Sequence, residues 1–212
     1  MKSAALSVWL AILATAAVGY GGWWAYQRLT VDPLRFPEGA ERAAKPAAEF
    51  LAGKKPNFSL TERSEKSFDS KSLAGKVWVV TFFYTSCPGP CFRQNQALAQ
   101  VQEDLEGRDV RFVSITCDPT TDTPATLRKY AAQFGADPER WLFLTGQFDS
   151  IKGIAQKQFL MPLDKQSHSE RAIVIDHEGE IRDVFDTLDA DDMKRMTRLL
   201  IELDEMAAAE QS

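Results

Sequence analysis

The chain has 212 residues, of which 44% are hydrophobic, so it is long enough for a membrane segment and one compact domain of roughly 150 residues. Acidic residues outnumber basic residues by 30 to 25, and the formal net charge is -5 at pH 7. The basic residues are scattered, so no positive stripe is available to follow a phosphate backbone. The composition therefore argues against a nucleic-acid partner.

An uncharged run, Ala4–Tyr26, opens the chain. As a helix it would reach about 34 Å, and the hydrocarbon core of a bilayer measures about 30 Å. Trp23 and Trp24 close the run, where aromatic rings suit the headgroup interface. Residues 1–28 are therefore predicted to form an N-terminal transmembrane helix. The alternative is a signal sequence that is cleaved near Ala16.

Residues 29–56 are rich in alanine, proline and charge and lack a sustained period, which is typical of a linker. Residues 57–212 are predicted to form one domain, because strand-like and helix-like segments alternate along them. Such alternation is typical of an α/β fold, in which helices pack on a largely parallel central sheet.

The elements of this domain are predicted from hydrophobic periodicity and from capping residues. The first strand is almost continuously apolar and aromatic, as expected of a strand that is buried on both faces. Strands are predicted at Val77–Tyr84, Val110–Thr116, Arg171–Asp176 and Ile181–Asp186. Helices are predicted at Cys91–Glu106, from Pro124 towards Gly135, at Phe148–Phe159, and after the acidic cluster Asp189, Asp191 and Asp192.

Cys87 and Cys91 lie in the connection between the first predicted strand and its helix. In open α/β sheets, ligands bind at this carboxyl end of the strands. The amino terminus of the helix carries partial positive charge and free N–H groups, which favour a thiolate over a thiol. The two sulfurs are therefore candidates for metal binding or redox chemistry. A disulfide within the loop, or two incidental small hydrophobic residues, is the alternative.

The sequence resembles the SCO/SenC family of copper proteins that assist the assembly of cytochrome c oxidase. The similarity extends over about residues 57–203. It rests on the stretch Phe82–Cys91 (FFYTSCPGPC), on Asp118-Pro119 followed by Asp122-Thr123-Pro124, on Trp141–Gly146 (WLFLTG), and on His168-Ser169. The resemblance implies a thioredoxin-like fold with a membrane anchor. It also implies that copper is held by Cys87, Cys91 and His168.

The chemistry of these residues suits copper. Two soft thiolates match Cu(I), and one imidazole keeps Cu(II) accessible as well. A closed structural zinc site would need four protein ligands, and the sequence has no second Cys-x-x-Cys or His pair to complete one. The spacing of His168 from the cysteines says little by itself, and its role as a ligand rests on the resemblance. The other histidine, His177, is predicted to be simply exposed in a polar turn.

The resemblance implies a copper chaperone more than a catalyst, with the copper centre of cytochrome c oxidase subunit II, or another copper acceptor, as its target. A copper donor chaperone and a thiol reductant would be further partners. The alternative function is that of a membrane-anchored thiol–disulfide oxidoreductase, in which Cys87 and Cys91 form a redox-active dithiol. Because an exposed dithiol copper site belongs on the oxidising side of an energy-coupling membrane, we expect a bacterial inner-membrane protein with its domain in the periplasm.

Two further residues follow the second predicted strand. Cys117 ends that strand on the face of Val113 and Ile115, so it is predicted to be a core residue. Its alternative is a position near the metal or a role in resolving a disulfide, because the strand ends on the crevice side. Asp118 comes next, and it is predicted to hydrogen-bond near the thiols or to orient a partner, with a loop cap as the alternative.

Overall fold

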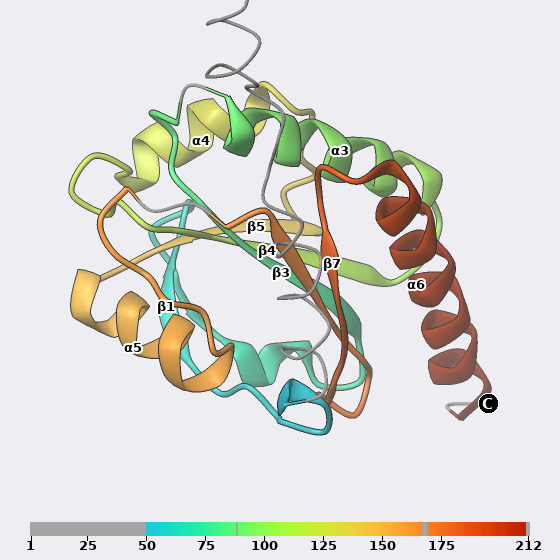
Figure 1. Ribbon diagram of the computed structural model, residues 1–212. Coiled ribbons are helices and arrows are strands. Elements are labelled where there is room, and N and C mark those ends of the chain that lie inside the picture. The colour runs from blue at the N-terminus through green and yellow to red at the C-terminus, as the bar shows by residue number, and fades with distance from the viewer. Residues whose placement is uncertain (1–49, 88, 167–168, 211–212) are drawn as a thin grey trace, which may run out of the picture. The chain divides into compact units, whose positions relative to one another are not determined.

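The computed structural model describes residues 50–87, 89–166 and 169–210 (Figure 1). The chain divides into two compact units, 1–42 and 43–212, and all described residues belong to the second. The predicted transmembrane segment, the signal-sequence alternative, most of the predicted linker and His168 therefore lie outside the described residues. None of the helices in the described part of the chain is long and apolar enough to span a bilayer.

The described residues form an α/β domain with one sheet of seven strands in the order β2-β1-β5-β4-β3-β6-β7. The strands are β1 (Ser59–Glu62), β2 (Ser67–Asp69), β3 (Val77–Phe83), β4 (Val110–Thr116), β5 (Trp141–Thr145), β6 (Arg171–Ile175) and β7 (Ile181–Asp186). The helices are the 3-10 helix η1 (Ser70–Leu73), α3 (Pro90–Asp104), α4 (Pro124–Ala132), α5 (Phe148–Gln158) and α6 (Ala190–Glu210). All four predicted strands and all four predicted helices are present, and their ends agree with the predicted ones or differ by at most three residues.

The sheet is mixed, so the prediction of a largely parallel sheet is wrong. Only the central pairs β3–β4 and β4–β5 are parallel. The pairs β1–β2, β1–β5, β3–β6 and β6–β7 are antiparallel. β6 and β7 follow each other through a short turn, which allows only antiparallel pairing. β1, β2 and β5 were not predicted, because each has five residues or fewer and too little alternation to show a period.

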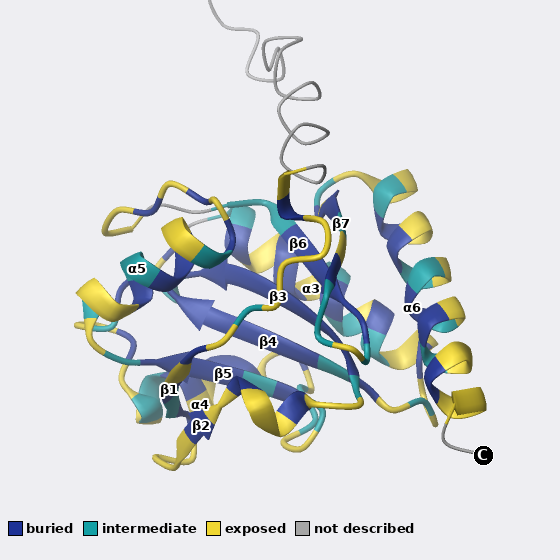
Figure 2. Cartoon of the chain, turned by 90° about the horizontal axis from the view of Figure 1, so that it is seen from below, coloured by how far each residue is buried: buried dark blue, intermediate teal, exposed yellow. Residues whose placement is uncertain are grey.

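The central strands separate two hydrophobic clusters, one on each face of the sheet. Every residue of β3 is buried, and alternate side chains enter opposite clusters because successive side chains of a strand point to opposite faces. Val77, Val79 and Phe83 pack with residues of α3, α4 and α6. Trp78, Val80 and Phe82 pack in the other cluster, with residues of α5. Figure 1 shows these helices on opposite sides of the sheet, and Figure 2 shows their exposed residues facing outward.

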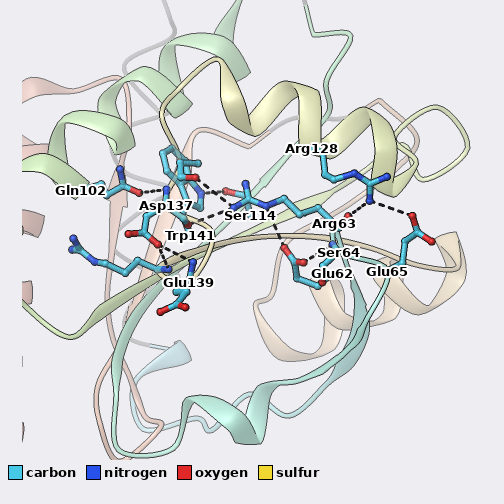
Figure 3. Close-up of polar contacts among 12 residues, drawn as sticks. Glu62, Arg63, Ser64, Glu65, Gln102, Ser114, Arg128, Asp137, Glu139 and Trp141 are labelled. Atoms are coloured by element: carbon cyan, nitrogen blue, oxygen red, sulfur yellow. Dashed lines mark hydrogen bonds and ion pairs between the residues drawn. The ribbon is translucent and has the colours of Figure 1, made fainter.

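Helix α4 begins with the predicted capping arrangement and holds one edge of the sheet. The Thr123 side chain accepts a hydrogen bond from the Thr126 N–H, and Pro124 occupies the first turn. From the same helix, Arg128 donates to the Arg63 carbonyl at 2.6 Å and pairs with Glu65 at 3.2 Å (Figure 3). The β1–β2 hairpin is thereby tied to α4.

A buried polar network crosses the central strands. Trp141 of β5 donates its indole N–H to the Ser114 hydroxyl of β4 at 2.9 Å (Figure 3). Ser114 in turn lies 3.1 Å from the hydroxyl of Thr81 on β3. All three residues are almost fully buried, so these contacts satisfy polar groups that would otherwise destabilise the core.

The register of β3 and β4 positions the candidate site. Phe83, the last residue of β3, pairs with Thr116, the last residue of β4. Because the strands are parallel, the connections that follow them leave from the same edge of the sheet. The loop of Cys87 and the loop of Asp118 are therefore neighbours, as the sequence predicted.

Candidate functional site

The loop after β3 turns tightly and carries both cysteines to the start of α3. The Cys87 N–H donates to the Tyr84 carbonyl at 3.3 Å, which closes the turn. Cys91 lies in the first turn of α3, where its backbone N–H donates to the sulfur of Cys87 at 3.4 Å. Both cysteines are free thiols, with relative exposures of 7% for Cys87 and 2% for Cys91. Cys87 therefore lies at the amino terminus of the helix, as predicted, and Cys91 lies beneath it.

The two thiols have opposite electrostatic environments. Burial opposes ionisation of Cys87, but hydrogen bonds from the Gly89 N–H, the Cys91 thiol and N–H, and the Tyr84 hydroxyl outweigh it and lower the pKa of Cys87. Burial and the neighbouring Cys87 sulfur raise the pKa of Cys91. Burial, followed by the hydrogen bond to Cys87, also raises the pKa of Tyr84 to about 12. When the pair loses one proton, the thiolate therefore forms at Cys87 and not at Cys91.

Two buried amide side chains of α3 form hydrogen bonds to the backbone on either side of the Cys87–Cys91 loop. The Asn95 side chain donates to the Cys91 carbonyl at 2.8 Å and to the Tyr130 hydroxyl at 3.3 Å. The Gln94 side chain donates to the Phe82 carbonyl at 3.2 Å and accepts from the Thr187 hydroxyl at 3.2 Å. Neither residue was predicted. The available signal was an amide pair at the third and fourth positions after Cys91, on the helix face that Leu98 continues.

Cys117 occupies the core position that was predicted for it. It is 1% exposed and belongs to the cluster of Val113 and Ile115, whereas Cys87 and Cys91 belong to the cluster on the other face of the sheet. Burial, with the nearby Asp122 carboxylate, raises the pKa of Cys117 to about 12. A buried, neutral thiol of this kind is unreactive.

Asp118 forms hydrogen bonds at the end of β4, and among the described residues none of them is to Cys87 or Cys91. Its backbone N–H donates to the Thr116 hydroxyl at 3.0 Å, which caps the end of β4. Its carboxylate accepts a hydrogen bond from the Gln166 side chain at 3.3 Å. His168 lies outside the described residues, but Gln166 precedes it by two positions. Gln166 is therefore hydrogen-bonded to the loop that follows β4, at the edge of the sheet from which the dithiol loop also leaves.

The prediction for His177 is wrong, because this side chain is not simply exposed. It is only 12% exposed, and its Nε2 atom lies 2.9 Å from the carboxylate of Glu210. The His177 carbonyl accepts from the N–H of Gly75, so the residue lies near the amino end of β3, at the opposite end from the dithiol. Its contacts join the β6–β7 turn to the end of α6.

Cys87 is expected to be alkylated faster than Cys91 by iodoacetamide in the reduced, folded protein. The lowered pKa of Cys87 makes it a thiolate at lower pH than an ordinary cysteine, whereas the raised pKa of Cys91 keeps it protonated. Peptide mass spectrometry after brief alkylation at several pH values measures both rates. In urea the rates should become equal, and equal rates in the folded protein would contradict the assignment.

Comparison of the sequence with known proteins identifies a family that matches most of the chain. The sequence model of the SCO1/SenC family matches residues 47–203. The SCO1 protein homolog of Bacillus subtilis is 32% identical over 119 residues, which are 55% of this chain and 62% of that protein. The chain thus covers less than two thirds of that relative's length.

Solved structures share the fold. A SCO1/SenC family lipoprotein from Bacillus anthracis is 28% identical and has a TM-score of 0.68, with 72% of this chain and 96% of that chain covered. Bradyrhizobium japonicum ScoI, solved with copper bound, is 26% identical and has a TM-score of 0.56, with coverages of 67% and 98%. The predicted α/β sheet flanked by helices is confirmed as the architecture of these proteins. Because the family match extends through most of the chain and the fold agrees, this chain belongs to the SCO1/SenC family.

Proposed function

We propose that this protein binds copper and delivers it to an assembling copper centre of cytochrome c oxidase, with subunit II as the acceptor. The observation that carries the proposal is the pair of free cysteines at the amino terminus of α3, one sulfur hydrogen-bonded to the backbone of the other. Soft thiolates are the donors that Cu(I) prefers. The family membership of the chain and the copper-bound ScoI structure support this choice of metal.

The environments of the two thiols suggest how copper would enter and leave. The pKa of Cys87 is lowered and that of Cys91 is raised, so Cys87 loses its proton more readily and would provide the first sulfur ligand. Cys91 is protonated at neutral pH, and binding must displace its proton. Copper affinity should therefore rise with pH, and an acceptor that takes the metal allows Cys91 to regain its proton. His168, as the third ligand, would complete the site.

The reduced protein should bind about one copper ion per chain, and Cys87→Ser or Cys91→Ser should abolish tight binding because the thiolates supply most of the affinity. His168→Ala should weaken Cu(II) binding more than Cu(I) binding. Metal analysis gives the stoichiometry, and sulfur-to-copper charge-transfer absorption reports thiolate ligation. Cys117→Val is the matched control and should keep both signals. Full stoichiometry with an unaltered spectrum in Cys87→Ser/Cys91→Ser would refute the copper site.

A second candidate function is the reduction of a disulfide in a copper site or another extracytoplasmic target. The lowered pKa of Cys87 favours it, because the thiolate is the nucleophile of thiol–disulfide exchange. Exchange with generic substrates is nevertheless expected to be slow, because Cys-x-x-x-Cys lacks the two-residue spacing that is typical of thioredoxins. An insulin-reduction assay tests this. A turnover comparable to that of thioredoxin would place the disulfide chemistry first, and Cys87→Ser controls for the nucleophile.

We further propose that residues 1–28 anchor the protein in a bacterial inner membrane, with its domain in the periplasm. The support is the uncharged run Ala4–Tyr26 with its terminal aromatic residues. After fractionation, the full-length chain should remain in the membrane pellet during alkaline carbonate extraction. Replacement of Leu10 and Leu13 by Arg should release it, since charge in the bilayer core is costly. A soluble periplasmic form that begins near Ala17 would remove the anchor.

A further inference from the structure

Asp122 is a buried carboxylate that the proposed copper chemistry does not use. It lies in the loop between β4 and α4 and is 0% exposed. Burial of a carboxylate without compensation costs several kcal/mol, so a retained one needs strong partners. Within the part of the chain that the structure describes, no lysine or arginine forms an ion pair with it. Its compensation comes from hydrogen bonds alone.

Three donors converge on this carboxylate. One oxygen accepts the hydroxyl hydrogen bond of Thr85. The other accepts from the Thr85 backbone N–H at 3.0 Å and from the Thr116 hydroxyl at 2.5 Å. An ionised carboxylate can only accept, and hydrogen bonds to a charged acceptor are about twice as strong as neutral ones. Both oxygens are therefore used, and Thr85 is held at two points.

The hydrogen bonds between Thr85 and Asp122 matter because of where Thr85 lies in the chain. Thr85 is the second residue after β3 and lies two residues before Cys87. Thr116 is the last residue of β4, which pairs with Phe83 of β3. Asp122 thus joins the ends of two parallel strands and fixes the direction in which the chain leaves β3. The turn that closes between Tyr84 and Cys87 starts from this fixed point.

We propose that Asp122 is a positioning residue for the dithiol, whose carboxylate sets the place of the Cys87 sulfur relative to Cys91 by holding Thr85. The inference deepens the proposed copper function and rests on it for the role of the sulfurs. If Asp122 only capped the turn, one hydrogen bond to the backbone N–H of Thr85 would be enough, but Asp122 also accepts from the Thr85 hydroxyl. The doubly held Thr85 restrains both the backbone and the side chain immediately before the sulfur that lies nearer the surface.

Two substitutions test this contact in the full-length, reduced protein. Asp122→Asn preserves the shape of the side chain but replaces one acceptor oxygen with a donor, so at least one of the three hydrogen bonds is lost. Thr85→Val removes only the hydroxyl. Both should shift the sulfur-to-copper charge-transfer band in the same direction and speed Cu(II) release about tenfold, the effect of losing one hydrogen bond to a charged acceptor. Thr85→Ser, which keeps both donors, should restore the wild-type values.

Asp176→Asn is the matched control. Asp176 is also a buried carboxylate, 2% exposed, and it accepts from the Glu180 N–H at 2.8 Å and from Arg182 at 3.2 Å. It follows β6 next to Ile175, which pairs with Trp78 near the amino end of β3, away from the dithiol. This variant should lower the free energy of unfolding without moving the copper spectrum. If Asp122→Asn and Thr85→Val behave like Asp176→Asn, Asp122 is merely structural and the inference is refuted.

A second readout does not depend on copper. The equilibrium between the Cys87–Cys91 dithiol and its disulfide, measured in glutathione buffers, depends on how the two sulfurs are placed. Asp122→Asn and Thr85→Val should change this equilibrium constant about tenfold, with Asp176→Asn unchanged. If the wild-type protein binds no copper, the proposed function fails while this measurement still decides the positioning role. An unchanged constant in both variants would overturn that role.

Discussion

The parallel pairing of β3 with β4 is the constraint on which the arrangement of the dithiol depends. It brings Phe83 opposite Thr116 and sends both following loops out of the same edge of the sheet. Every residue of β3 is buried, so the strand cannot slip by one residue without exchanging its two apolar faces. The loop of Cys87 therefore starts from a fixed point, and the loop of Asp122 lies beside it.

Polar groups that are buried around this edge restrain it further. Asp122, Asn95 and Gln94 are at most 1% exposed, and each bonds to the backbone of β3, of α3 or of the connection between them. Buried polar groups stabilise a fold only when they are paired, so each of these contacts favours one geometry over alternatives. The result is a rigid support for two sulfurs in a loop that has little secondary structure of its own.

The asymmetry between the thiols follows from depth. Cys87 lies at the start of the helix, where N–H groups and the Tyr84 hydroxyl donate to it, whereas Cys91 lies one helical turn deeper and is mostly surrounded by the core. Cys117 shows the limit of this effect, because burial on the other face of the sheet leaves it without such donors from α3. The pKa of Cys87 is thus lowered, whereas those of Cys91 and Cys117 are raised.

The sequence alone determined the elements with strong local signals. The apolar run of β3, the capped start of α4 at Thr123-Pro124 and the placement of Cys87 and Cys91 at a helix amino terminus could all be predicted, because each depends on neighbouring residues. The tertiary structure decided what depends on distant ones: the short strands β1, β2 and β5 form only against β4 or each other, and the sheet is mixed because β6 returns antiparallel to β3. The same reason explains why the contact of His177 with Glu210 and that of Thr85 with Asp122 were not foreseen, since hydrogen bonds between residues that are 33 and 37 positions apart leave no periodic trace in a sequence.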